Sequence, residues 1–199
     1  MTASSTAGYA AAADSLVRQY ESVTFEQVHA PVLHLLPPCG RALDIGAGTG
    51  RDAAALADRG LAVTAVEPTA ELRAHGMRLH AGKGIVWIDD GLPDLPVLAA
   101  GTGQFDLILL TAVWMHLDAD ERSRAMARIA GHLAPGGRVI MTLRHGPVPE
   151  GRRMFDVSGD ETAALAQANG LVCQFSQPRP DMFGREGVTW TVLALVRAG

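Results

Sequence analysis

Three glycines at alternate positions mark the stretch of this sequence best suited to hold a small molecule. Gly46, Gly48 and Gly50 follow the short apolar run 42–45 and precede the helix-forming run 51–57. Glycine lets the backbone turn tightly and come close to a ligand. The free N–H groups at the start of the following helix point back toward that turn. The sequence therefore predicts a strand, a glycine turn and a helix N-terminus that together form a small-molecule site.

The residue at position 51 separates two classes of cofactor. A dinucleotide fingerprint requires a small residue three positions after its second glycine. Counted from Gly48, that position is Arg51, which is bulky and charged. The spacing therefore disfavours a nicotinamide oxidoreductase, which we keep as a distant alternative.

Residues 43–50, Leu-Asp-Ile-Gly-Ala-Gly-Thr-Gly, resemble motif I of the class I S-adenosylmethionine-dependent methyltransferases. The order and spacing of the expected elements from Arg41 to Val196 are similar to that family as well. The resemblance implies S-adenosyl-L-methionine as the cofactor, with S-adenosyl-L-homocysteine as its product. It also implies that Glu67, which lies 17 residues beyond Gly50, takes the two ribose hydroxyls, because a carboxylate accepts two hydrogen bonds at once.

The same resemblance implies a larger cofactor-binding set. For the adenine edge the sequence offers both Asp89 and Asp90 and does not choose between them. Asp44 has the alternative of holding loop amides, and Asp52 that of capping its helix. The expected cofactor-binding residues are Tyr20, Asp44, Gly46, Ala47, Gly48, Gly50, Arg51, Asp52, Glu67, Pro68, Asp89, Asp90, Gly91, Leu92, Thr111, Ala112, Val113 and Met115.

Two histidines are candidates for the catalytic chemistry. A sulfonium methyl group is already activated, so methyl transfer mainly requires a nucleophile held in line at about 3–3.5 Å. A hydroxyl or a protonated amine also needs a general base, and histidine is the usual choice near neutral pH. His116 follows the fourth expected strand and His145 the fifth. We expect one of them to orient or deprotonate the acceptor; the alternative is that His116 caps the next helix or packs against Trp114.

Three arginines in or beside the polar loop 144–153 are candidates for substrate binding. Arg144, Arg152 and Arg153 are either solvated loop residues or the rim of a pocket for an acceptor that carries a carboxylate or a phosphate. No metal site is expected. The closest histidine pairs lie five positions apart, whereas two ligands on one helix face are usually four apart.

The order of the elements predicts an α/β fold. Strands and helices alternate until the last two strands, which follow each other directly and form an antiparallel pair. This pattern is typical of a doubly wound seven-stranded sheet, mostly parallel, with an antiparallel last strand at its edge. The expected strands are 41–45, 61–66, 84–88, 105–110, 138–143, 171–175 and 188–196. The expected helices are 11–20, 25–36, 51–59, 69–79, 118–133 and 158–169.

We divide this single structural domain into an N-terminal tail and helical lid, residues 1–36, and a Rossmann-like methyltransferase domain, residues 37–199. The alternative is that the N-terminal helices simply cover one face of the sheet. The motif Pro135-Gly136-Gly137 is expected to turn the chain from the fifth helix into the fifth strand.

Charge and composition narrow the class of partner. The formal net charge of −4 gives no electrostatic footprint for a nucleic-acid backbone. The two cysteines do not suggest a disulfide framework, and no secretory leader or membrane span is expected, so we expect a cytoplasmic protein. The function that fits best is methyl transfer to an N, O or S nucleophile of a small molecule. RNA or protein methylation and a non-catalytic S-adenosylmethionine-binding subunit or sensor are the alternatives.

Overall fold

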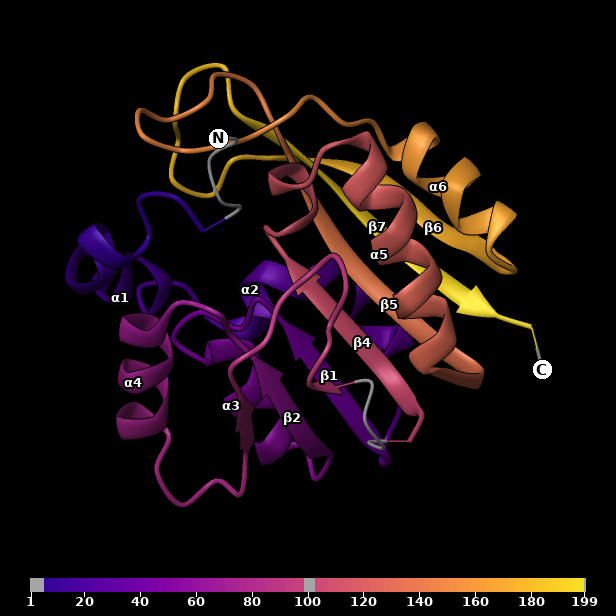
Figure 1. Cartoon of the computed structure of the whole chain (residues 1–199), viewed down its shortest axis with the longest axis horizontal. Coiled ribbons are helices and arrows are strands. Elements are labelled where there is room, and N and C mark those ends of the chain that lie inside the picture. The colour runs from indigo at the N-terminus through magenta and orange to yellow at the C-terminus, as the bar shows by residue number, and fades with distance from the viewer. Residues whose placement is uncertain (1–5, 99–102, 199) are drawn as a thin grey trace.

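A seven-stranded sheet forms the centre of the molecule in the computed structural model, which describes residues 6–98 and 103–198 (Figure 1). The strand order is β3-β2-β1-β4-β5-β7-β6. The strands are β1 Arg41–Ile45, β2 Ala62–Val66, β3 Val86–Ile88, β4 Phe105–Thr111, β5 Leu133–His145, β6 Leu171–Pro180 and β7 Thr189–Arg197.

The sheet confirms the predicted architecture but places its antiparallel strand elsewhere. Strands β1 to β5 pair in parallel, and β7 runs antiparallel between β5 and β6. The last strand therefore lies inside the sheet, and the expectation that it forms the edge was wrong. Residues 192–195 of β7 are buried, whereas most side chains of β6 are exposed. A polar strand suits an edge, and an apolar strand suits the interior.

The helices lie on both faces of the sheet. Figure 1 shows α5 and α6 side by side over one face and α1 beside α4 at the other end of the molecule. The α-helices are α1 Ala13–Tyr20, α2 Phe25–His29, α3 Arg51–Asp58, α4 Ala70–Leu79, α5 Ala119–His132 and α6 Gly159–Ala168; the 3₁₀ helices are η1 Ala10–Ala12, η2 Ala30–Leu35 and η4 Trp114–His116.

The starts of the helices follow their capping residues. Thr24 accepts a hydrogen bond from the backbone of Gln27, whose side chain accepts one from the backbone of Thr24. Asp118 and Glu121 form the same reciprocal box at the start of α5. The helix expected over 25–36 ends at residue 29 and continues as η2, because Pro31 has no N–H to donate.

The fifth strand begins earlier than expected. Leu133 already pairs with Phe105, and the next pair joins Arg138 to Leu107, so residues 134–137 bulge out of the strand. The expected turn at Pro135-Gly136-Gly137 is therefore a bulge inside β5, where Gly136 adopts a φ of 73°.

Strand β4 divides the core into two layers. Ile108 and Leu110 pack on the face covered by α5, while Leu107 and Leu109 pack on the face that α3 covers, because successive side chains of a strand point to opposite faces. Phe25 of α2 joins the α3 layer, so this part of the N-terminal region covers the sheet. Leu16 of α1 packs instead on Leu72 of α4. None of the helices among the described residues has the length and apolarity needed to cross a membrane.

Candidate functional site

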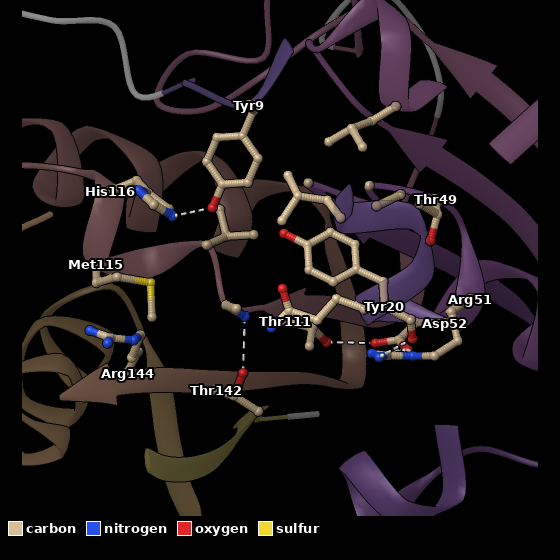
Figure 2. Close-up of a pocket in the computed structure, with 18 of the residues that line it drawn as sticks. Tyr9, Tyr20, Thr49, Arg51, Asp52, Thr111, Met115, His116, Thr142 and Arg144 are labelled. Carbon is tan, nitrogen blue, oxygen red and sulfur yellow. Dashed lines mark hydrogen bonds and ion pairs between the residues drawn. The ribbon is translucent and has the colours of Figure 1, made fainter. Parts of the chain in front are cut away.

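A cavity of about 720 Å³ lies at the carboxyl ends of the parallel strands, a size typical of sites for small molecules. Ends of β1, β4 and β5 reach it, as do the turn after β2 and the N-terminal segment. Figure 2 shows Thr49, Arg51 and Asp52 at one end of the cavity and Met115, His116 and Arg144 at the other.

Most of the residues singled out from the sequence line this cavity. They are Tyr20, Asp44, Gly46, Ala47, Gly48, Arg51, Asp52, Glu67, Pro68, Gly91, Leu92, Thr111, Ala112, Val113, Met115, His116, Arg144 and Arg152. Five others do not line it: Gly50, Asp89, Asp90, His145 and Arg153.

The glycine turn needs its glycines for two different reasons. Gly46 and Gly48 have φ angles of 70° and 58°, a region that other residues rarely adopt. A Cβ at Gly46 would lie 2.5 Å from the Val113 side chain, so glycine also lets the turn pack closely against the segment that follows β4. Gly50 has a positive φ of 83° as well, and it allows α3 to approach β3, because its Cβ would lie 2.7 Å from the ring of Trp87.

Glu67 ties the glycine turn to the end of β2. Its Oε2 accepts a hydrogen bond from the backbone N–H of Gly48 at 2.8 Å, and its Oε1 accepts one from Thr69 at 2.8 Å. The residue is 5% exposed. Burial raises the pKa of the Glu67 carboxyl, and the two N–H donors act against that rise. The carboxylate is thus fixed in orientation at the wall of the cavity.

The two aspartates after β3 bond groups of the protein itself. Asp89 is exposed and pairs with Arg73 at 2.8 Å. Asp90 is buried and accepts hydrogen bonds from the backbone of Gly91, Val97 and Leu98. It therefore holds the loop that brings Gly91 to the cavity wall, together with Leu92.

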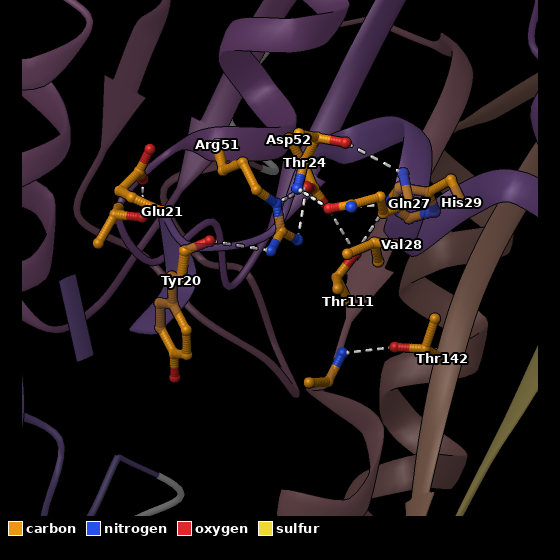
Figure 3. Close-up of polar contacts among 12 residues, drawn as sticks. Tyr20, Glu21, Thr24, Gln27, Val28, His29, Arg51, Asp52, Thr111 and Thr142 are labelled. Carbon is orange, nitrogen blue, oxygen red and sulfur yellow. Dashed lines mark hydrogen bonds and ion pairs between the residues drawn. The ribbon is translucent and has the colours of Figure 1, made fainter. Parts of the chain in front are cut away.

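A buried network centred on Asp52 forms the floor of the cavity (Figure 3). The Oδ2 atom accepts from the Thr111 hydroxyl at 2.6 Å and lies 2.8 Å from His29 Nε2. The Oδ1 atom accepts from Arg51 Nε at 2.7 Å, and a second guanidinium nitrogen of Arg51 donates to the carbonyl of Tyr20 at 3.3 Å. Burial alone would raise the pKa of Asp52, but His29 and Arg51 outweigh it and hold that pKa well below its usual range. Asp52 therefore joins α2, α3 and β4 and is more than a helix cap.

Asp44 offers an unsatisfied acceptor to the cavity. Its carboxyl is 2% exposed, and its Oδ2 atom has no hydrogen-bond partner within the described parts of the chain. Burial, and after it the negative charge of Asp52, raises the pKa of Asp44 well above its usual value. A buried polar atom without a partner costs free energy, so a ligand group that donates a hydrogen bond would be stabilised here.

The other end of the cavity holds a histidine with a defined tautomer. His116 Nδ1 lies 2.7 Å from the carbonyl of Arg153, and Nε2 lies 2.9 Å from the Tyr9 hydroxyl. Because a carbonyl only accepts, Nδ1 carries the proton and Nε2 accepts from Tyr9. The Arg152 guanidinium lies 3.7 Å from the centre of the Tyr9 ring. Burial, followed by the nearby Arg152, lowers the pKa of His116, so its Nε2 lone pair is available near neutral pH.

His145 and Arg153 lie outside the main cavity. His145 Nε2 is 2.8 Å from the Thr191 hydroxyl, beside a second cavity of about 300 Å³. Arg153 forms ion pairs with Asp118 and Glu121 and donates to the carbonyl of His116. It therefore fixes the start of α5. Within the residues that the structure describes, no three His, Cys, Asp or Glu side chains are grouped to hold a metal ion.

Two parts of the site were missed in the sequence. Tyr9 lies in an alanine-rich start that reads as a loose tail, and nothing local distinguishes it. The second part is the hairpin connection from Arg179 to Trp190, whose residues at the cavity are Arg179, Asp181, Met182, Phe183, Arg185 and Trp190. Strand β6 runs parallel to β1–β5, so its end reaches the same edge of the sheet. That orientation follows once β7 is known to lie between β5 and β6.

The hydrogen bond between Tyr9 and His116 predicts a titration shift. The Tyr9 hydroxyl donates to the neutral imidazole and favours it over the charged form, so Tyr9→Phe is expected to raise the pKa of His116 toward its ordinary value. A pH titration of the histidine ring signals by NMR measures the change. The control is Thr49→Val, which removes a hydroxyl from the opposite end of the same cavity, where it donates to Glu21, and it should leave the pKa of His116 unchanged. An unshifted titration in Tyr9→Phe would contradict the assigned geometry.

Comparisons with known proteins find matches that are described as methyltransferases. Residues 43–141 match a family model described as a methyltransferase domain. An uncharacterized methyltransferase of Geobacillus kaustophilus is 29% identical over 102 residues, which are 49% of this chain and 44% of that protein. The matched region thus spans less than half the length of that relative.

Two solved structures share the fold. One is a 1,6-didemethyltoxoflavin-N1-methyltransferase of Burkholderia thailandensis with bound 1,6-didemethyltoxoflavin and S-adenosylhomocysteine. It has a TM-score of 0.69 and 23% identity and covers 100% of this chain and 92% of its own. The other is a TehB-like SAM-dependent methyltransferase from Corynebacterium glutamicum, with a TM-score of 0.70, 19% identity and coverage of 94% and 98%.

Proposed function

The chain belongs to the class I S-adenosylmethionine-dependent methyltransferases, and from this premise we propose that it transfers a methyl group from S-adenosylmethionine to a small molecule. One observation carries the proposal: the fixed carboxylate of Glu67 and the glycine turn that it bonds meet at one end of a cavity of suitable size. The acceptor would occupy the other end, beside His116.

The residues at the first end fit the cofactor. Glu67 presents a buried carboxylate of the kind that accepts two hydroxyl hydrogen bonds, and Asp44 has an oxygen without a partner in the described residues, ready for an ammonium or hydroxyl donor. The backbone of the glycine turn lines the cavity beside them at Gly46 and Gly48. We propose that these residues hold the ribose and the amino-acid part, with Gly91 and Leu92 beside the adenine. Arg51 would act through Asp52, with which it is already paired.

The protein's own part in the reaction is positioning and proton handling. When bound, S-adenosylmethionine supplies a methyl group that is activated on a sulfonium. Tyr9 and Tyr20 border the cavity and would limit the access of water. His116 holds its proton on Nδ1, so its Nε2 could take a proton from an acceptor hydroxyl or amine that displaces Tyr9. We propose His116, rather than His145, as the base.

Two observations support a small acceptor. The cavity volume of about 720 Å³ falls in the range of compact ligands. Tyr9, whose ring stacks under Arg152, extends the N-terminal segment over the acceptor end. We propose that this segment acts as a lid, whereas α2 packs on one face of the sheet.

Thermal melting with different ligands tests the proposal. S-adenosylhomocysteine is expected to raise the melting temperature in a concentration-dependent way, because a ligand that binds only the folded state stabilises it. NAD should not. Transfer of a labelled methyl group to members of a panel of small metabolites would then identify the acceptor. Stabilisation by NAD but not by S-adenosylhomocysteine would contradict the proposal, as would a panel that reacts only when RNA or protein is supplied.

A further inference from the structure

Two arginines flank a tryptophan in one row across the last three strands of the sheet. The strand register pairs Arg144 of β5 with Trp190 of β7, and Trp190 with Arg179 of β6. Residues paired directly across neighbouring strands point to the same face. All three line the main cavity, and the Arg179 guanidinium lies 6.0 Å from the centre of the Trp190 ring.

Arg144 carries a buried positive charge that the protein leaves uncompensated. The residue is 8% exposed. Its Nε has no partner among residues 6–98 and 103–198, and its hydrogen bond to the Gly146 carbonyl is long, at 3.5 Å. No carboxylate of these residues lies within ion-pair distance of it. Burial, followed by the nearby charge of Arg185, lowers the pKa of Arg144, and the charge of Asp181 opposes this shift without forming an ion pair.

The acidic residue nearest in this region, Asp181, is already occupied. Its Oδ1 accepts from Arg185 at 2.6 Å and from the Trp190 indole N–H at 2.8 Å. Its Oδ2 accepts from the backbone N–H groups of Phe183 and Arg185 at 3.0 Å. Asp181 therefore pairs with Arg185 and orients the indole. Arg144 and Arg179 form no ion pair within the described residues; Arg179 donates to the Val28 carbonyl at 2.9 Å, and its Nε has no partner there.

Charge is separated along the cavity. Asp44 and Glu67, which have no arginine partner among the described side chains, lie at the glycine turn. Arg144 and Arg152 line the cavity near His116, and Arg179 reaches it beside the Val28 carbonyl of α2; none of the three has a carboxylate partner in the described structure. A buried charge without a counter-ion costs several kcal/mol in general, so a site that keeps one is organised for a ligand of opposite charge.

We propose that the row Arg144–Trp190–Arg179 is the acceptor-binding subsite, and that the acceptor carries an oxyanion, either a carboxylate or a phosphate. The inference rests on the proposed function for the identity of the ligand as acceptor. A guanidinium binds either oxyanion through two parallel hydrogen bonds. The indole between the two arginines provides a flat apolar surface for the body of the ligand.

Titration calorimetry with three probes tests the subsite, with and without saturating S-adenosylhomocysteine. The probes are benzoate, inorganic phosphate and the neutral benzamide. Arg144→Met is expected to lower the affinity for the anion that binds by roughly 10- to 100-fold, the effect of losing charge-assisted hydrogen bonds. Arg179→Gln should act in the same direction. The matched control is Arg138→Gln, which removes a positive charge from the other end of β5, where Arg138 contacts Gln174.

Stability provides a second readout that a merely structural arginine would not give. Without ligand, Arg144→Met should melt at a higher temperature than the wild type, because a buried charge is replaced by an apolar side chain of similar length. A lower melting temperature would show that Arg144 supports the fold, which contradicts the proposal.

Each binding outcome decides the proposal. Tighter binding of benzoate or of phosphate distinguishes the two oxyanions. The subsite is overturned if the wild type binds neither anion, if benzamide binds as well as benzoate, or if Arg144→Met binds the anions unchanged. Sensitivity to Arg144 without sensitivity to Arg179 would place the anion in the smaller cavity and also overturn the row. Anion binding without S-adenosylhomocysteine binding would contradict the proposed function alone, and the reverse would contradict only the subsite.

Discussion

Replacing Glu67 with alanine is expected to weaken the binding of S-adenosylhomocysteine by at least roughly 100-fold. Two hydrogen bonds to a charged carboxylate are lost at once, each with a contribution of about 1.5–3 kcal/mol. The variant also releases the backbone N–H groups of Gly48 and Thr69, which the carboxylate holds in place. Calorimetric titration of the ligand into the purified variant measures the change.

A graded series of substitutions separates the effect of the carboxylate on ligand affinity from the effect of the glycine turn. Glu67→Gln keeps one acceptor oxygen and the side-chain length, so its loss of affinity should be intermediate. The matched control is Glu71→Ala, an exposed glutamate in α4, which should bind the ligand as the wild type does. A Glu67→Ala variant that binds within about threefold of the wild type would remove the role proposed for this residue.

Replacing Asp52 with alanine is expected to lower the free energy of unfolding by about 3–5 kcal/mol. The change removes one partner of a buried ion pair and leaves the others without compensation, which is strongly destabilising. Arg51, His29 and the Thr111 hydroxyl all contact this carboxylate, which is 4% exposed. Urea unfolding followed by circular dichroism gives the difference.

The exposed Asp58 provides the control for that experiment. It lies at the end of the same helix and pairs with Lys83 at the surface. Because surface ion pairs contribute about 0–1 kcal/mol, Asp58→Ala should unfold close to the wild type. Equal unfolding free energies for Asp52→Ala and Asp58→Ala would show that the buried network does not stabilise the fold.

The pH dependence of stability follows from the direction of the Asp52 pKa shift. Its pKa is lowered in the folded state, so the stability it contributes is fully present above the pKa of an unfolded aspartate, about 3.9. That contribution is lost as the pH falls below this value. Asp44 acts in the opposite sense, because its raised pKa makes the folded state take up a proton first. The difference in unfolding free energy between the wild type and Asp52→Ala contains the contribution of Asp52, and it should shrink in acid.

The sequence by itself determined the glycine turn and the acidic strand end that lie together at one end of the cavity. The glycine turn is readable because positive φ angles at Gly46 and Gly48 are local requirements of the backbone. Glu67 is readable because it ends an apolar strand at a fixed distance from that turn. The capping boxes at Thr24 and Asp118 predicted the starts of two helices. Their signal is local too, because each capping side chain bonds a backbone N–H only three residues away.

The tertiary structure decided which residues lie at the other end of the cavity. The Tyr9 hydroxyl bonds His116, which lies 107 positions away in the sequence. Arg144 of β5 and Arg179 of β6 lie in one row only because β7 is placed between their strands. Neither contact has a local signal, because it depends on which strand pairings bury the most apolar surface over the whole sheet. In the folded chain, Asp90 accepts hydrogen bonds from the backbone of its own loop, and Arg153 forms an ion pair with Glu121 at the start of α5. Residue type alone could not separate these charges from the ones that face the cavity, because burial and pairing, which set their roles, are properties of the folded chain.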